Sequence, residues 1–270
     1  MLETAQPTKL WWGRLRPHLG TVTHWQIGPS RLWVTRYSQE WRIAHHQSDN
    51  PFASEMIVES DVPTESIDPA AQVYRFGFKN TPEILQLMPA LADRAVVIKP
   101  EHPFRVSGGE EITMYVTTSL WIRLETGERS DLLHELPSYR PSDTWFGANT
   151  REGEVCYASR TLGRLRIEDL DFHPHRAITA LRLQNQASDP LLLDRVKLPV
   201  QYLSLYANKD NTFWTQAATL VRGQDGDLAE LQLAKASPKE AGQVKKVADS
   251  RLKPGRNLVV RAFSKLFAEF

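Results

Sequence analysis

Residues 112–124, with the sequence ITMYVTTSLWIRL, alternate between apolar or threonine side chains and mostly polar ones. The even positions carry the apolar set: Ile112, Met114, Val116, Thr118, Leu120, Ile122 and Leu124. A period of two is typical of a β-strand with one buried and one exposed face. At about 3.3 Å per residue the run would reach about 40 Å, roughly twice a usual strand. We therefore expect a break near Thr118 and Ser119, where the chain passes between two sheets.

Short runs of similar character, separated by turn residues, recur along the chain. Residues 22–27 and 31–37 flank the turn Gly28-Pro29-Ser30, and residues 212–222 and 227–233 form a second hairpin signal. We expect residues 104–106 to pair with the strand that begins at Ile112, and residues 45–70 to be mostly loop. About sixteen strands without intervening helices predict an all-β fold of two packed, antiparallel, β-sandwich-like units.

The C-terminal part has a different pattern. Ser237-Pro238-Lys239-Glu240 resembles a capping box with proline at the first helical position, which predicts a helix to about Asp249. Residues 257–270 place apolar side chains at helical spacing, so we expect a short helical C-terminus. The expected organisation is a partly ordered lead-in (1–20), two β domains (21–128 and 129–236) and a basic helical tail packed on the β body (237–270).

The totals narrow the class of protein. The chain has 270 residues, of which 41% are hydrophobic and 24% charged, as in globular proteins. Residues 235–265 carry nine basic and two acidic side chains, although the whole chain has a net charge of only +1. One cysteine, with no signal peptide and no transmembrane segment in the sequence, favours a cytoplasmic location. A basic segment can bind an anionic partner, but few aromatic residues accompany the charges, so nucleic acid is an unlikely partner.

Several phrases of the sequence resemble a known family. They occupy residues 92–94 (ADR), 96–100 (VVIKP), 120–122 (LWI), 142–147 (SDTWFG), 153–158 (GEVCYA) and 195–199 (RVKLP). They are similar to the uncharacterised microbial proteins catalogued as domain of unknown function 432, and the resemblance covers most of the chain. It implies no catalytic residues. Because members of this family neighbour mechanosensitive channels, the resemblance implies a membrane-protein partner.

Two groups of residues could form a small-molecule or metal site. Asp171, His173 and His175 would point to one side of an extended chain and could bind a divalent metal with a further carboxylate; the alternative is a polar surface turn at Pro174. A ligand pocket could be lined by four other residues, with the tryptophan stacking on a ring and the charged groups fixing its orientation: Tyr139, Arg140, Asp143 and Trp145. The alternative is a loop held by its own hydrogen bonds.

Two further features have a functional and a structural interpretation. Cys156 could be a nucleophile with His134 as its base, but a lone cysteine within a strand is usually a small buried hydrophobe. The C-terminal helix could dock on a partner or an anionic membrane surface, or it could pack on its own sheet. The docking residues would be Arg256, Arg261, Phe263, Lys265 and Phe267.

Known signatures of phosphate-binding loops, dinucleotide folds, serine hydrolases and zinc ribbons do not occur in the sequence. The sequence therefore favours a non-catalytic accessory or binding protein that docks a protein or membrane-associated partner, or itself as a homo-oligomer, without a cofactor. The alternative is a metal-dependent enzyme that uses the Asp171-x-His173-x-His175 cluster.

Overall fold

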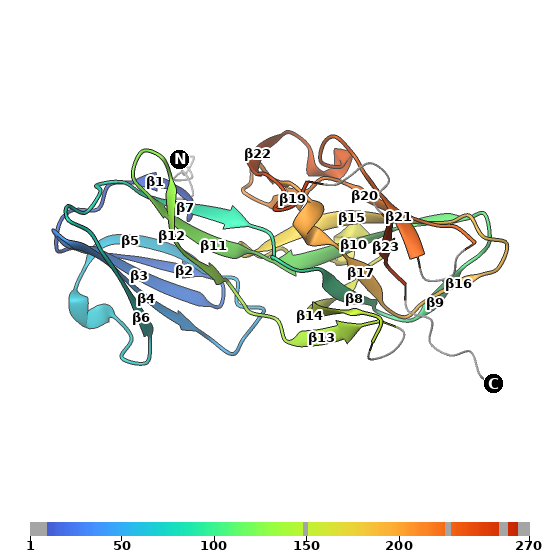
Figure 1. Cartoon of the computed structure of the whole chain (residues 1–270), viewed down its shortest axis with the longest axis horizontal. Coiled ribbons are helices and arrows are strands. Elements are labelled where there is room, and N and C mark those ends of the chain that lie inside the picture. Colours follow the sequence, from blue (N-terminus) through green and yellow to red (C-terminus); the bar gives the residue numbers. More distant parts are fainter. Residues whose placement is uncertain (1–9, 148–150, 225–227, 254–258, 264–270) are drawn as a thin grey trace, which may run out of the picture. The chain divides into compact units, whose positions relative to one another are not determined.

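A computed structural model describes residues 10–147, 151–224, 228–253 and 259–263 (Figure 1). Within these ranges the regular structure consists of β-strands and four single-turn 3-10 helices, and there is no α-helix. The predicted all-β class is confirmed. None of the described helices has the length and apolar character needed to cross a membrane.

The chain forms two compact units, and each unit is built from three separate segments. Unit 1 contains Met1–Pro89, Trp121–Tyr139 and His173–His175, whereas unit 2 contains Ala90–Leu120, Arg140–Phe172 and Arg176–Phe270. These units do not follow the expected domains of residues 21–128 and 129–236, because the chain leaves each unit and returns to it. The described residues 237–253 and 259–263 belong to unit 2, whereas the rest of the expected tail lies outside the described residues.

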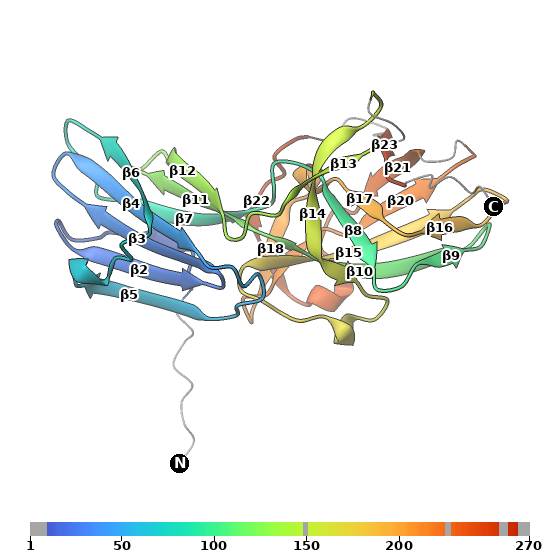
Figure 2. The same ribbon diagram turned by 90° about the horizontal axis from the view of Figure 1, so that it is seen from below.

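Unit 1 contains a five-stranded and a four-stranded sheet. The first has the order β5-β2-β3-β4-β6, with every neighbouring pair antiparallel, and Figure 2 shows these strands side by side in that order. Its strands are β2 (Val22–Ile27), β3 (Ser30–Arg36), β4 (Glu40–Gln47), β5 (Met56–Val62) and β6 (Gln72–Gly77). The second has the order β1-β7-β11-β12, with β1 (Gly13–Leu15), β7 (Leu85–Ala90), β11 (Trp121–Thr126) and β12 (Asp131–Pro137). The 3-10 helix η1 (Thr64–Ser66) lies between β5 and β6.

Alternation along the strands gives the five-stranded sheet an apolar inner face, and Val22, Trp33 and Ala44 on its outer face are buried as well. Trp25, Leu32, Val34, Trp41 and Ile43 occupy that inner face and are almost completely buried. The indole N–H of Trp41 donates to Thr126 Oγ1 at 3.1 Å, and the Thr126 hydroxyl donates to the carbonyl oxygen of Ile84 at 2.7 Å. These two hydrogen bonds join β4 to β11 inside unit 1, so the two sheets share one core.

Unit 2 contains three sheets. The largest has the order β22-β18-β19-β15-β20-β21-β23 with β10 also paired to β15, and the smaller ones have the orders β13-β14-β8-β17 and β16-β9. The strands of the largest sheet are β10 (Glu111–Ser119), β15 (Arg176–Asn185), β18 (Leu205–Asn208), β19 (Phe213–Thr215), β20 (Ala218–Arg222), β21 (Leu228–Leu233), β22 (Val244–Ala248) and β23 (Val259–Arg261). The other strands are β8 (Val96–Pro100), β9 (Phe104–Val106), β13 (Asp143–Phe146), β14 (Glu154–Gly163), β16 (Leu191–Leu193) and β17 (Val196–Leu198). Single 3-10 turns occur at η2 (Ile167–Asp169), η3 (Val200–Tyr202) and η4 (Lys239–Ala241).

The long alternating run breaks where it was expected to. It forms β10 and β11, which lie in different sheets and are separated only by Leu120. The even positions from Met114 to Leu124 are buried, as predicted. The other face is less exposed than expected, because Thr117, Ser119 and Trp121 are buried as well.

Other expectations about the elements were wrong. The region expected to be loop contains β5, and β9 pairs with β16 rather than with β10. Where a helix was predicted from Ser237 to Asp249, the chain forms only η4 and then β22. Part of the second predicted helix is β23, and the remainder lies outside the described residues except for Ala262 and Phe263. Pairing with β18 and β21 overrides the local helical signals. Three strand pairs in the described ranges are parallel, so two of the three sheets of unit 2 are mixed.

Candidate functional site

The outer face of the five-stranded sheet in unit 1 carries a pocket of about 470 Å³. This volume is within the range of pockets that bind small molecules or side chains. The lining residues come from β3, β4, β6 and the segment around η1: Trp33, Thr35, Arg42, Ala44, Thr64, Ile67, Val73 and Arg75. Every one of them belongs to unit 1.

The strand register arranges the pocket floor in two rows. Trp33, Ala44 and Val73 are directly opposite one another on β3, β4 and β6, and they form an apolar row. Two residues along the strands, Thr35 lies opposite Arg42. Arg42 lies opposite Arg75, so the second row is polar and cationic. The apolar row, of which Val73 is exposed while Trp33 and Ala44 are buried, therefore adjoins two positive charges.

Glu40 ties the two arginines together. It accepts a hydrogen bond from Arg42 Nη2 at 2.7 Å, and its other oxygen accepts from Arg75 Nε and Nη2 at 2.8 and 2.6 Å. The hydrogen bond from Arg75, followed by that from Arg42, lowers the pKa of the Glu40 carboxyl. Like charges opposite each other destabilise a sheet, and this carboxylate offsets that repulsion. The three groups together still carry one net positive charge.

Arg42 is not fully satisfied by its neighbours. Its guanidinium lies 4.8 Å from the centre of the Tyr37 ring, in a cation–π arrangement. Its Nε is buried, and within the described part of the chain it has no hydrogen-bond partner. A buried donor of this kind costs free energy.

Packing fixes the apolar row in place. Ile67 and Ala71, from the segment that follows η1, pack on the cluster of Val22, Trp33 and Ala44. His24 on β2 lies opposite Trp33, and its ring stacks on the indole with centroids 5.1 Å apart. The pocket is therefore formed without a ligand. Its chemistry suits a carboxylate or another planar anion attached to an apolar group, because the arginine fork matches two oxygens.

Unit 2 has a second pocket of about 400 Å³ above β10, β15 and β20. Ala180, Ala217, Ala218 and Ala234 contribute small side chains to its lining, which also includes residues of η4. The charged lining residues largely have partners: Arg182 forms an ion pair with Glu111, and Glu240 accepts a hydrogen bond from the Tyr115 hydroxyl. Arg182 and Lys239 are balanced by Glu240 and Glu111, so this pocket indicates no ligand class as clearly as the first.

The predicted ligand pocket is only partly assembled. Arg140 Nη2 donates to Asp143 at 3.3 Å, and Arg94 Nη1 reaches the other carboxylate oxygen at 3.5 Å. Trp145 is 42% exposed, whereas Tyr139 is buried in unit 1. Neither of the two pockets above includes these residues. The Arg140–Asp143 contact agrees with the alternative interpretation, a loop held by its own hydrogen bonds.

The predicted metal cluster has no structural support. His173 and His175 have ring centroids 5.5 Å apart, and His175 is completely buried. Its Nε2 lies 3.2 Å from the carbonyl oxygen of Pro51, and a Cβ on Gly28 would come within 2.2 Å of its Nδ1. The ring is thus enclosed by backbone. No group of three or more His, Cys, Asp or Glu residues that could hold a metal occurs in the described ranges.

Cys156 is a buried hydrophobe. Burial, with a smaller effect of Glu154, raises the pKa of its thiol to about 11. It packs with Ala95, Val97 and Phe146 in unit 2, whereas His134 belongs to unit 1. A thiol with a raised pKa is a poor nucleophile at neutral pH, which supports the structural interpretation.

The predicted docking surface fails at its one residue whose side chain is described. Phe263 is 2% exposed and forms a β-bridge with Val196, so it belongs to the core. Arg256, Lys265 and Phe267 lie outside the described residues, as does the side chain of Arg261 in β23.

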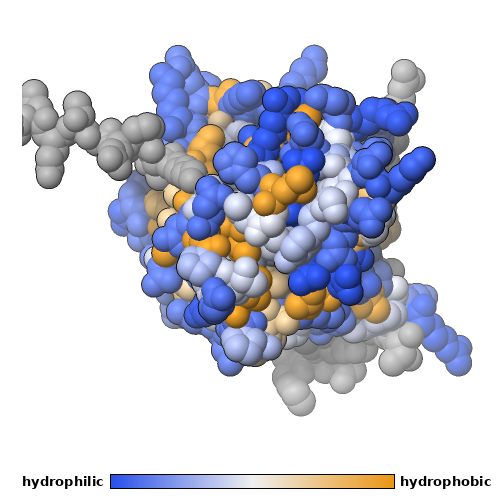
Figure 3. Space-filling model, turned by 90° about the vertical axis from the view of Figure 1, so that its left-hand side faces the viewer, coloured by the Kyte–Doolittle hydropathy of each residue, from blue (hydrophilic) through white to orange (hydrophobic). Residues whose placement is uncertain are grey.

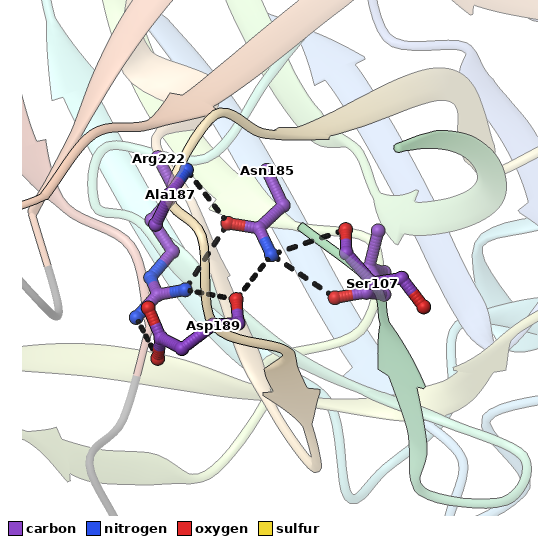
Figure 4. A network of polar contacts seen from close by, with 6 residues as sticks. Ser107, Asn185, Ala187, Asp189 and Arg222 are labelled. Atoms are coloured by element: carbon purple, nitrogen blue, oxygen red, sulfur yellow. Dashed lines mark hydrogen bonds and ion pairs between the residues drawn. The ribbon is translucent and has the colours of Figure 1, made fainter. Parts of the chain in front are cut away.

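A polar network in unit 2 has a structural role. The buried Asn185 amide donates to the carbonyl oxygens of Val106, Ser107 and Asp189, and its oxygen accepts from Arg222 Nη1 and the Ala187 N–H (Figure 4). Because both ends of this side chain are satisfied, it holds the loops beside β9 and β15 rather than offering a group to a ligand.

Sequence reasoning missed the Trp33–Arg42–Arg75 pocket. Alternation within β4 and β6 places Arg42 and Arg75 each on an outer face, and that signal was available. The sequence contains no signal that β4 pairs with β6, because β5 and η1 intervene between them in the chain.

Comparisons with known proteins give one match. Searches of curated proteins and of solved structures found no similar protein. The model of one family matches residues 11–268, which is nearly the whole chain. The chain therefore belongs to the family described as Protein of unknown function (DUF432), in agreement with the resemblance of its sequence phrases.

Proposed function

We propose that this chain is a non-catalytic binding protein that docks a partner through the outer face of unit 1. The partner, a protein or a membrane-associated molecule, presents an anionic group to Arg42 and Arg75 and an apolar group to the exposed side chain of Val73. We further infer that each unit is a β-sandwich and that the protein acts in the cytoplasm. The single buried cysteine is consistent with a reducing compartment.

One observation carries the proposal: two arginines face each other across β4 and β6 beside an apolar row, and one carboxylate serves both. An ion pair with only a structural role would be complete with one arginine for the one carboxylate. Here a second cation is retained at the surface, where the Arg75 side chain is 65% exposed. Large apolar side chains also reach the surface of unit 1, including Val73 and Leu132, and Figure 3 shows hydrophobic side chains among hydrophilic ones on one face of the molecule.

A pair of small probes tests the proposal. Phenylpropionate and its neutral amide have the same apolar part and differ in the carboxylate, and their binding to the full chain can be followed by NMR titration. We expect the carboxylate to bind more tightly and to shift the indole resonance of Trp33. The double variant Arg42→Gln, Arg75→Gln should weaken its binding at least about tenfold, equivalent to about 1.4 kcal/mol.

Arg14→Gln is the matched control, because Arg14 is another partly exposed arginine of unit 1 that forms an ion pair, with Glu128. It should leave the affinity unchanged. Equal binding of the acid and the amide, or an equal loss in the control, would overturn the proposal.

A further inference from the structure

We propose that the occupant of this pocket is an extended acidic segment of a partner protein, which adds as an antiparallel strand to the free edge of β6. The inference rests on the proposed function and names its partner class. It requires that β6 has an unpaired edge, that this edge adjoins the pocket, and that its chemistry selects an acidic strand.

The outer edge of β6 is unpaired. β6 is the last strand of its sheet and pairs only with β4. In the described ranges no other segment hydrogen-bonds to it. The backbone N–H of Phe78 donates to the carbonyl oxygen of Gln39. This hydrogen bond shows which residues of β6 form backbone hydrogen bonds with β4 and which do not. At every second residue before Phe78, that is at Phe76 and Tyr74, the backbone N–H and C=O groups point toward β4. Those of Val73 and Arg75 point to the other side, toward the free edge.

The same two residues line the pocket. Val73 and Arg75 share the outer face, and their side chains form the ends of the apolar and the cationic rows. A strand added at this edge would exchange backbone hydrogen bonds with Val73 and Arg75. The side chains directly opposite them would extend both rows on the same face.

The two edges of the sheet differ in their protection. Edge strands of monomeric proteins usually carry charges or irregularities that prevent pairing with other chains. At the opposite edge, β5 contains Glu59 and Asp61, its register with β2 shifts, and Asp61 has a φ of 60°. β6 has the sequence QVYRFG, with one charge, and Val73 is 50% exposed. It is the less protected of the two edges.

Charge selects the kind of strand. Because Arg42 and Arg75 exceed Glu40 by one positive charge, an acidic residue fits opposite Arg75, and an apolar residue fits opposite Val73. In an antiparallel strand this order reads acidic–any–apolar from the N-terminus. A second copy of β6 contains no acidic residue, so it would bring no such complement.

Binding of labelled peptides by fluorescence anisotropy tests the inference. The first peptide carries Glu-Thr-Val within a neutral, capped sequence, and the second carries Lys-Thr-Val in its place. A third keeps Glu-Thr-Val but has N-methyl groups on its glutamate and valine, which removes the backbone donors that face β6. We expect the first to bind at least about tenfold more tightly than either of the others, and to weaken as salt is raised.

A protein variant tests the same edge. Val73→Pro removes an outward N–H, and proline is tolerated at such edge positions. It should abolish peptide binding, and the N-methylated peptide shows independently whether the lost backbone hydrogen bonds are the cause. Met56→Pro, at the first residue of β5 on the opposite edge, is the matched control and should bind the peptide normally. Should Val73→Pro fail to fold, the N-methylated peptide still decides.

The outcomes separate this inference from the proposed function. Strand addition is overturned if the N-methylated peptide binds as tightly as the first peptide, or if the Val73→Pro variant binds the first peptide normally. The pocket would then be a site for small anions. Concentration-dependent dimerisation that Val73→Pro abolishes would make a second copy the occupant and would also overturn the inference. If neither the peptide nor phenylpropionate binds, the proposed function fails as well.

Discussion

The two units of this chain accommodate arginine charges in different ways. In unit 2, Arg176 is 4% exposed and donates to the hydroxyls of Thr117, Ser119 and Thr161 and to the backbone oxygen of Thr117. Within the described ranges no carboxylate forms an ion pair with it. In unit 1, Arg42 and Arg75 lie near the surface and share Glu40. A guanidinium surrounded by neutral oxygens of its own unit serves the architecture, whereas a surplus cation beside the exposed Val73 is available to a ligand.

The units differ in histidine content as well. Seven of the eight histidines belong to unit 1, and only His102 belongs to unit 2. His45 on β4 lies 2.9 Å from the Ser30 hydroxyl, and burial, with smaller effects of His134 and His46, lowers its pKa to about 4. Burial also lowers the pKa of His134. Unit 1 should therefore lose stability in mild acid through these two partly buried histidines.

The first test of the comparison makes the same substitution in both places. Arg176→Met should lower the free energy of unfolding by about 3 kcal/mol, because it leaves several buried oxygens without a donor. Arg42→Met, at a surface ion pair, should cost about 0.5 kcal/mol or less. Urea denaturation measures both. Equal losses would mean that the two arginines have the same structural role.

Acid provides the second test. Because the His45 pKa is lower in the folded state than its ordinary 6.5, the folded state stays neutral while the unfolded state takes up a proton. The contribution of His45 is fully present above about pH 6.5 and is lost as the pH falls to 4, by up to about 3 kcal/mol. His45→Gln should flatten the dependence of stability on pH in this window. His102→Gln, in unit 2, is the control, and an equal flattening there would contradict the assignment.

The third test concerns the core of unit 1. Trp41→Phe keeps an aromatic ring but removes the N–H that binds Thr126, which should cost about 1 kcal/mol. Trp145→Phe, at a 42% exposed position in unit 2, should change stability by less than about 0.5 kcal/mol. Thermal unfolding of the two variants would show the difference. A larger loss at Trp145 would indicate that its loop contributes more than its exposure suggests.

Local signals predicted the strands well and their partners poorly. The alternation from Ile112 to Leu124 identified β10, β11 and the break between them, because burial on one face acts within a single strand. Pairing depends on distant segments: β9 pairs with β16, and β22 forms where a capping box suggested a helix. The site was missed for the same reason. Each arginine could be placed on an outer face, but only the register of β4 with β6 makes them neighbours.

Substitution of Glu40 should have the smallest effect on stability, and it is the most direct test of the arginine pair. In the unliganded protein this carboxylate occupies the donors of Arg42 and Arg75 that a ligand would use. Glu40→Gln keeps the size of the side chain and raises the net charge of the three groups from one to two. Phenylpropionate should then bind a few times more tightly, with a small fall in the unfolding temperature, because the two arginines then repel each other without a carboxylate between them. Calorimetric titration of the variant beside the unmodified chain measures the change. Weaker binding would mean that Glu40 is needed to orient the arginines, and the pair would then resemble Arg176 in serving the architecture of its own unit.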